Sequence, residues 1–304
     1  MTNDGVRYIS IEGGYKVFTQ RVGRGPIKLL LLHGGPGSTH EQFECFPEFL
    51  SQYGIELFLY DQLGSHYSDQ PDNPLLWTVE RFCEEVEQVR LGLGLDRFYL
   101  LGHSWGGMLA IEYALKYQHH LKALVVSSMT GSIASYIHRI NELRGQLPSD
   151  IITRMTKYEQ EHDFDAPAYK DMLVKHLYEH YVCRRIPWPK PVSRAISHLA
   201  MPVYSAMQGP NEFMVTGTIA GWDRWADLKD IRVPTLLIAG QHDTIRTSDV
   251  EEMSKLIPRA TVEICPEGSH LSCWDDQSHY FPALTQFLVN VERASTSLES
   301  QGEV

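Results

Sequence analysis

The stretch Leu100-Leu101-Gly102-His103-Ser104-Trp105-Gly106-Gly107 decides the fold. A β-rich run at 97–101 precedes it, and a helical pattern at 108–115 follows it. Between them, Gly102-x-Ser104-x-Gly106 has the spacing of a nucleophile elbow, the sharp strand–turn–helix connection that exposes a serine hydroxyl. Side chains two positions to either side of the serine would collide with the strand or the helix, so glycines are needed there. The stretch predicts Ser104 as a nucleophile beside a helix N-terminus, which stabilises negative charge.

Apolar runs alternate with helical patterns on both sides of this stretch. The chain opens with two short strands expected within 6–21. Continuous apolar runs, which are typical of strands buried on both faces, follow at 27–32, 56–60, 121–127, 235–239 and 260–264. An amphipathic helix is expected at 78–91, with Thr78 as its cap and Phe82, Val86 and Val89 on one face. This alternation predicts an α/β fold with a mostly parallel central sheet and helices on both faces.

The alternation stops after Met129 and resumes near Trp225. The intervening residues 130–225 show helical periodicity, with helices expected at 141–146, 151–162 and 169–181, and we expect them to form a helical cap over the carboxyl edge of the sheet. Residues 1–129 and 226–293 then form the core, which ends in a helix at 280–291. The segment 294–304 is small and polar, and is expected to be a disordered tail.

Composition narrows the function classes. The chain of 304 residues has a formal net charge of −11, which disfavours nucleic acid and anionic membrane surfaces as partners. No apolar run approaches the length that crosses a bilayer. The five cysteines show no metal-binding spacing, and residues 1–11 have no apolar segment typical of a signal peptide, so we expect a reduced, cytoplasmic setting. No metal or organic cofactor is implied, and the pattern sets no oligomeric state.

A serine nucleophile needs a base, and the base needs a carboxylate to orient it. In the strand–turn–helix context of the elbow, the acid and then the histidine follow the serine, each after a late strand. Asp243 lies just after the strand at 235–239, and His270 follows the strand at 260–264. The chain has 14 histidines, but His103 is a neighbour of Ser104 on the elbow and points away from it. The predicted triad is Ser104, Asp243 and His270, with His270 as general base and then general acid.

An oxyanion hole needs two backbone N–H groups. One is expected from Trp105, the residue after the nucleophile, and the other from the glycine-rich loop His33-Gly34-Gly35-Pro36-Gly37. Pro36 has no N–H, so Gly35 is the first choice and Gly34 the second.

The segments 33–37 (HGGPG), 60–65 (YDQLGS), 102–107 (GHSWGG), 209–213 (GPNEF) and 268–270 (GSH) together resemble the proline iminopeptidase (prolyl aminopeptidase) family of α/β hydrolases. Related amino-acid amide hydrolases and tricorn-interacting aminopeptidases share parts of this pattern. The resemblance implies an α/β-hydrolase fold and a serine hydrolase that removes an N-terminal residue, often proline, from a small molecule or short peptide with a free amine. It also implies that Glu212 binds the α-ammonium group of the substrate.

The sequence departs from the family pattern at two places. The family commonly has a second acidic residue directly after the triad aspartate, where this chain has Thr244, and its Gly-Ser-Gly-Arg-Ser loop reads Gly-Ser-His-Tyr-Ser at 64–68. Binding of a cationic amine should therefore be weaker. An esterase, a lactonase or a biosynthetic hydrolase acting on a molecule without an amine is the alternative. A ligand-binding protein without catalytic activity is a third hypothesis, against which the intact Ser104, Asp243 and His270 argue.

Overall fold

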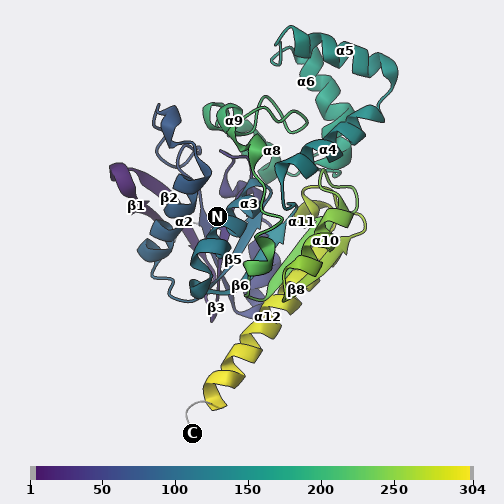
Figure 1. Cartoon of the computed structure of the whole chain (residues 1–304). Coiled ribbons are helices and arrows are strands. Elements are labelled where there is room, and N and C mark those ends of the chain that lie inside the picture. Colours follow the sequence, from purple (N-terminus) through teal and green to yellow (C-terminus); the bar gives the residue numbers. More distant parts are fainter. Residues whose placement is uncertain (1–4, 302–304) are drawn as a thin grey trace.

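The computed structural model describes residues 5–301, and its centre is a single eight-stranded sheet with the order β1-β2-β4-β3-β5-β6-β7-β8 (Figure 1). The β1–β2 and β2–β4 pairs are antiparallel, and all the other pairs are parallel, as the strand–helix alternation predicts. The strands are β1 (Val6–Ser10), β2 (Lys16–Val22), β3 (Ile27–Leu32), β4 (Ile55–Tyr60), β5 (Phe98–His103), β6 (Leu121–Ser127), β7 (Thr235–Gly240) and β8 (Ala260–Cys265).

The central strands are buried on both faces because successive side chains point to opposite sides of the sheet. In β3, Leu30 and Leu32 belong to one apolar cluster, whereas Leu29 and Leu31 belong to the other. All of these side chains are fully buried. The continuous apolar run at 27–32 thus supplies two cores at once, which explains why it shows no polar alternation.

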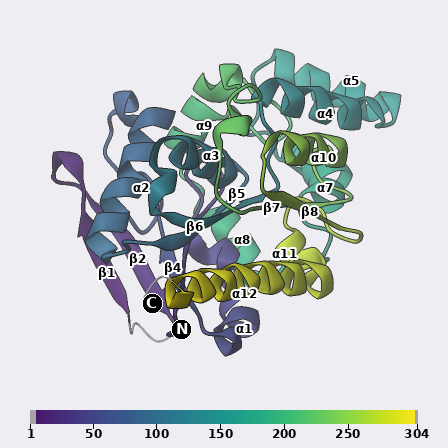
Figure 2. The same ribbon diagram turned by 60° about the horizontal axis from the view of Figure 1, so that its bottom comes forward.

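Helices cover both faces of the sheet (Figure 2). The cluster that contains Leu30 also holds side chains of α2, α3 and α10, and the cluster that contains Leu29 holds side chains of α1 and α12. In α2, Thr78 is the N-cap and its hydroxyl accepts the backbone N–H of Arg81, which confirms the predicted cap. These covering helices are α1 (Phe46–Leu50), α2 (Val79–Leu93), α3 (Trp105–Tyr117), α10 (Thr247–Leu256), α11 (Ser272–Asp275) and α12 (Gln277–Gln301).

Between β6 and β7 the chain leaves the sheet and forms a group of helices beyond its carboxyl edge (Figure 1). We call residues 130–225 the cap. Its helices are α4 (Ile133–Gly145), α5 (Ser149–Gln160), α6 (Pro167–Leu173), a π-helical turn at Val174–Tyr178, α7 (Glu179–Tyr181), α8 (Lys190–Ser197) and α9 (Met201–Met207). The expected helices at 151–162 and 169–181 match α5 and the α6–α7 segment, whereas the expected helix at 141–146 covers only the end of α4. The sequence pattern did not predict α8 and α9, because both are short and have a proline in the first turn, where a helix tolerates it but the pattern also fits a turn.

The final helix, α12, is longer than expected and runs through Gln301. The expectation of a disordered segment from 294 onward is therefore wrong for 294–301, whereas 302–304 lie outside the described residues. Polar composition alone does not end a helix, because small hydroxyl side chains can bond to the preceding turn. Ser295 and Thr296 do so, donating to the carbonyls of Val291 and Glu292 at 3.0 Å each. No helix within 5–301 is both long and apolar enough to cross a membrane.

Candidate active site

Ser104 occupies the turn between β5 and α3 in the strained conformation that the elbow requires. Its φ and ψ are 56° and −125°, in a region that non-glycine residues rarely adopt. A Cβ atom at Gly102 would collide with the carbonyl oxygen of Gly106, and one at Gly106 would collide with that of Leu32. The two glycines of the motif are thus required by close backbone contacts, as the sequence predicts.

The structure brings His270 and Asp243 together from the loops after β8 and β7. The ring Nδ1 of His270 lies 2.8 Å from Oδ1 of Asp243. The opposite ring atom, Nε2, is buried and has no hydrogen-bond partner among the described residues. His270 and Ser104 line the same cavity, so the free nitrogen is available to a proton from the serine side. The three predicted residues therefore share one site, and their catalytic roles remain predictions.

The two charged partners shift each other's pKa in opposite directions. Burial alone would lower the pKa of His270, but the charge and hydrogen bond of Asp243, together with the charge of Glu212, outweigh it and raise that pKa. Burial would raise the pKa of Asp243, but the charge and hydrogen bond of His270 outweigh it and lower that pKa. Asp243 is thus ionised wherever His270 titrates, which is the state that orients a neutral base.

Within residues 5–301, His103, the histidine on the elbow, has no carboxylate partner of this kind. Burial, and secondarily the charge of His270, lower the pKa of His103 to about 3. Its Nδ1 lies 3.4 Å from the hydroxyl of Ser127, and its ring packs 4.9 Å from that of His270. His103 is therefore a neutral packing residue, which agrees with its expected orientation away from Ser104.

The glycine-rich loop lies against the elbow. Its hydrogen bonds show which of Gly34 and Gly35 has a free N–H to donate to an oxyanion. The backbone N–H of Gly34 donates to Oε1 of Gln42 at 3.2 Å, so this group is already occupied. Gly35 lines the cavity beside Ser104 and Trp105, and within residues 5–301 its N–H and that of Trp105 donate to no protein acceptor. Gly35 also has a φ of 113°, which favours glycine. The geometry supports the first choice, Gly35 with Trp105, over Gly34.

Gln62 joins this loop to the elbow. Its side-chain Nε2 donates to the carbonyl of His33 at 3.1 Å, and its Oε1 accepts the indole N–H of Trp105 at 2.7 Å. The ring of His33 bonds on both sides, because Nδ1 lies 2.9 Å from the carbonyl of Gly34 and Nε2 accepts the backbone N–H of Gln62 at 3.0 Å. Burial keeps His33 neutral by lowering its pKa. The DQLGS motif therefore fixes the relative position of the two expected oxyanion donors.

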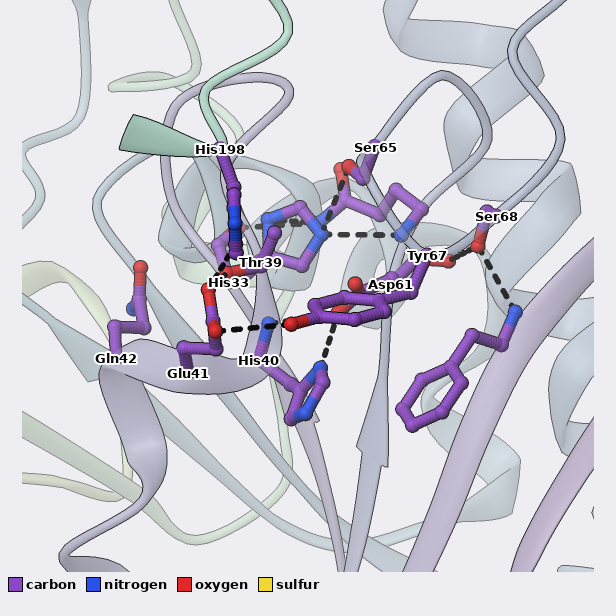
Figure 3. Close-up of polar contacts among 12 residues, drawn as sticks. His33, Thr39, His40, Glu41, Gln42, Asp61, Ser65, Tyr67, Ser68 and His198 are labelled. Carbon is purple, nitrogen blue, oxygen red and sulfur yellow. Dashed lines mark hydrogen bonds and ion pairs between the residues drawn. The ribbon is translucent and has the colours of Figure 1, made fainter. Parts of the chain in front are cut away.

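A buried carboxylate, Glu41, links the segment after this loop to the cap (Figure 3). The hydroxyls of Thr39 and Tyr67 donate to it at 2.8 and 3.0 Å. From the cap, Arg194 and His198 contact it at 2.9 and 2.8 Å. Burial opposes ionisation of Glu41, but these hydrogen bonds outweigh it and lower the pKa of the carboxyl.

A backbone hydrogen bond also joins the cap to the core. The N–H of Ala200, just before α9, donates to the carbonyl of Gly37 at 2.9 Å. The start of α9 is therefore attached to the glycine-rich loop, and α8 is attached to the segment after that loop through Arg194. Sequence reasoning did not find these connections, because their partners lie more than 150 residues apart along the chain.

Glu212 enters the same cavity from the segment after α9. Its side chain is 16% exposed, and Oε1 lies 3.8 Å from Nε2 of His270. The hydroxyl of Tyr136 donates to Oε1 at 2.6 Å, and the hydroxyl of Tyr204 also bonds to the carboxylate. Burial is the main cause that raises the pKa of Glu212. A carboxylate in such a position attracts a cation, which would restore its ionised form.

The cavity between cap and core is small and mostly apolar, with a volume of about 20 Å³. Its polar groups are Ser104, Ser128, Tyr136, Gln208, Glu212 and His270. The rest of the wall comprises Gly35, Trp105, Met108, Met129, Ile133, Ile219 and Ile245. Of the polar groups, Ser128, Tyr136 and Gln208 were not identified from the sequence. A lone glutamine near a helix end carries no motif, so only the three-dimensional arrangement reveals it.

Thr244, the residue in place of the expected second acid, is fully buried and does not line this cavity. Its hydroxyl donates to Oδ1 of Asp243 at 3.3 Å and lies 3.1 Å from Nδ1 of His270. The position therefore contributes to the triad and supplies no carboxylate for an amine.

Comparison with known proteins places this site in a family. A family model described as alpha/beta hydrolase fold matches residues 28–277. The proline iminopeptidase of Flavobacterium johnsoniae is 44% identical over 283 residues, which are 92% of this chain and 95% of that protein. The chain belongs to the proline iminopeptidase family of α/β hydrolases. Another member, from Elizabethkingia meningoseptica, is 42% identical and aligns with 93% of this chain and 97% of its own length.

Solved structures agree with this family assignment. The crystal structure of VinJ superimposes with a TM-score of 0.90 at 29% identity, covering 95% of this chain and 99% of VinJ. The proline iminopeptidase of Mycobacterium smegmatis superimposes with a TM-score of 0.87 at 28% identity, covering 96% and 100% of the two chains. The resemblance inferred from the motifs is confirmed, and this member of the proline iminopeptidase family is a serine hydrolase.

Proposed function

We propose that the protein is an aminopeptidase or amino-acid amidase that hydrolyses the amide bond next to a free N-terminal amine. One observation carries the proposal: the carboxylate of Glu212 faces the triad, with Oε1 at 3.8 Å from Nε2 of His270. A substrate ammonium bound to Glu212 places the carbonyl of that same residue beside Ser104. Binding the amine thus positions the first bond of the chain for attack. The likeness to proline iminopeptidases supports this assignment.

In the first half of the reaction, Oγ of Ser104 attacks the carbonyl carbon and its proton passes to Nε2 of His270. The N–H groups of Gly35 and Trp105 donate to the oxyanion that develops. The C–N bond then breaks, and the leaving amine takes the proton from His270. The aminoacyl group remains esterified to Ser104.

In the second half, water replaces the leaving amine. His270 removes a proton from the water as its oxygen attacks the ester carbonyl, and the same N–H groups hold the second oxyanion. The bond to Oγ of Ser104 breaks, and His270 returns the proton to that oxygen. The products are the free amino acid and the shortened amine.

The proposal is tested with p-nitroanilides and amides of proline, alanine and phenylalanine, each with a free and an acetylated amine. We expect turnover of the free-amine compounds and a loss of at least about 100-fold in kcat/KM on acetylation, because the acetyl group removes the charge that Glu212 binds. Equal turnover of free and acetylated substrates would contradict an aminopeptidase. No turnover of any amide, together with hydrolysis of simple esters, would favour an esterase.

Thr244 gives a reason to test a second function. Since this position supplies no carboxylate, the site has one acid fewer for an amine than the family pattern, which favours an esterase, lactonase or biosynthetic hydrolase on a molecule without an amine. Glu212→Gln separates the two functions. An aminopeptidase loses kcat/KM on amine-bearing substrates only, whereas an esterase shows no such selectivity.

We also propose a cytoplasmic location. All five cysteines are free and buried in the structure, at positions 45, 83, 183, 265 and 273. Unpaired thiols are typical of a reducing compartment. Fractionation of the native host with detection of the protein by antibody tests the location, and recovery from an extracytoplasmic fraction would contradict it.

A further inference from the structure

The cavity contains one buried polar atom that neither the fold nor the proposed mechanism uses. Gln208 follows α9, is 4% exposed, and lines the cavity with Ser104 and Glu212. Its side-chain Nε2 is buried and has no hydrogen-bond partner within residues 5–301. Buried amide groups without partners are rare in folded proteins, so each needs a physical explanation.

The backbone of Gln208 is fully engaged, in contrast to its side chain. Its N–H donates to the carbonyl of Tyr204 at 2.8 Å, and its carbonyl accepts the N–H groups of Thr216 and Gly217 at 3.0 Å each. The main chain therefore holds the residue in place without help from the carboxamide. A structural role for the side chain would have left its N–H bonded to a neighbour.

The other polar side chains of the cavity are already paired or have a role in the reaction. The hydroxyl of Ser128 donates to the carbonyl of His270 at 2.9 Å, and that of Tyr136 donates to Glu212 at 2.6 Å. Nε2 of His270 is the other buried unpartnered atom of the wall, and the proposed reaction supplies its proton. By the same reasoning, an acceptor on the substrate would satisfy the N–H group of Gln208 Nε2.

The surroundings identify the group that it binds. Met129, Ile133 and Ile219 make this wall apolar, so an N–H donor here requires an acceptor on the ligand. In an amine-bearing substrate the ammonium is assigned to Glu212 and the scissile carbonyl to the oxyanion hole. In an amino-acid amide, which has no further backbone carbonyl, the remaining acceptor is an oxygen on the side chain of that residue.

We propose that Gln208 is a specificity-determining residue that donates a hydrogen bond to a side-chain oxygen of the substrate's first residue. The inference rests on the proposed aminopeptidase function and narrows its substrate class. The enzyme then prefers a short hydroxyl-bearing residue to the apolar residue of the same shape. A site built to hydrogen-bond a hydroxyl rejects the analogue that lacks it, because the buried donor stays unpaired.

The test uses two pairs of substrates that differ only in the hydroxyl: the p-nitroanilides of serine and alanine, and those of threonine and valine. With the full-length enzyme we expect kcat/KM to be at least about 10-fold higher for the hydroxyl-bearing member of each pair. Gln208→Met keeps the length of the side chain and removes the donor, so both ratios should fall to about one. Gln146→Met, at the exposed end of α4, is the matched control and should keep both ratios.

The outcomes separate this inference from the proposed function. If the wild-type enzyme cleaves all four substrates but shows no preference within the pairs, Gln208 is not a specificity residue and the aminopeptidase function stands. The same conclusion follows if Gln208→Met lowers all four values equally. If the wild type cleaves none of these four substrates but cleaves the proline or phenylalanine compound, the inference about Gln208 is overturned and the aminopeptidase function stands. If it cleaves no amide or p-nitroanilide at all, both proposals are overturned. Labelling of Ser104 with a fluorophosphonate probe in each variant verifies that the site is folded.

Discussion

The hydroxyl of Thr244 lies 3.1 Å from Nδ1 of His270 and donates to the carboxylate that orients this ring. Thr244, the residue after Asp243, therefore contacts the imidazole of His270 at Nδ1, the nitrogen opposite the free Nε2. A carboxylate at this position would bring a second negative charge next to Asp243 unless it turned towards the cavity.

Replacing Thr244 by valine keeps the shape and removes the hydroxyl. We expect kcat to fall about 3- to 10-fold with little change in KM, because one neutral hydrogen bond to the triad is lost and no substrate contact changes. Steady-state kinetics on the best amide substrate measure both constants. Thr153→Val removes an exposed hydroxyl in α5 and should leave them unchanged. A rise in KM alone would show that Thr244 contacts substrate instead.

Substitutions of the triad residues should lower kcat to different extents. Ser104→Ala should abolish labelling by a fluorophosphonate and lower kcat by about 10⁶-fold, since no nucleophile remains. Asp243→Asn should lower kcat by about 10⁴-fold, because an amide favours the wrong tautomer of His270. If the fluorophosphonate still labels the Ser104→Ala variant rapidly, at another serine, then Ser104 is not the nucleophile.

The acid side of the pH profile should report His270. Its pKa is raised above 6.5, and the base must be neutral, so activity should be lost as the pH falls through that raised value. Glu212 contributes to the shift through its charge. Glu212→Gln should therefore move the acid limb to lower pH, measured as kcat/KM on an ester without an amine. An unchanged limb would mean that the two groups do not interact electrostatically.

Gln62 should affect catalysis without touching substrate. Gln62→Leu leaves the buried indole N–H of Trp105 and the carbonyl of His33 unpaired, at a cost of about 1 to 3 kcal/mol in the free energy of unfolding. We also expect kcat to fall at least about 10-fold, because the two oxyanion donors are no longer held together. Thermal unfolding and kinetics measure the two effects. Gln70→Leu, at an exposed position in the following loop, is the control.

The link between cap and core should depend on pH. The folded state lowers the pKa of Glu41, so this group stabilises the protein above its unfolded pKa of about 4.5 and loses that contribution as the pH falls through the lower folded value. Glu41→Gln should reduce the free energy of unfolding at pH 7 and flatten its decline in acid. Denaturant titrations at pH 3 to 7 measure both. A variant with the wild-type slope would assign the decline to other carboxyls.

Much of the fold could be predicted because its signals are local. The apolar run at 27–32, the cap at Thr78 and the glycines of the elbow each have a steric or hydrogen-bonding reason that is visible within a few residues. Asp243 and His270 could be placed for a related reason: the carboxyl ends of parallel strands meet at one edge. The helix at 294–301 is not predicted from composition, because the hydroxyl-to-carbonyl bonds of Ser295 and Thr296 that accompany it leave no compositional signal.

The contacts that complete the site are not local. Glu41 meets Arg194 and His198 across the boundary between core and cap, and Gln208 becomes informative only when its buried N–H is seen without a partner. Neither Glu41 nor Gln208 belongs to a spaced motif. Thr244 could be recognised as a departure from the family pattern, but its contact with the triad required the structure.

The attachment of Ala200 to Gly37 has a consequence for protein engineering. The short helix that begins there leads directly into Gln208 and Glu212. The residues proposed to select the substrate and the loop proposed to hold the oxyanion are therefore attached to each other. Grafting a foreign cap to change selectivity would disturb turnover as well, unless the graft carries residues 37–44 of the same donor.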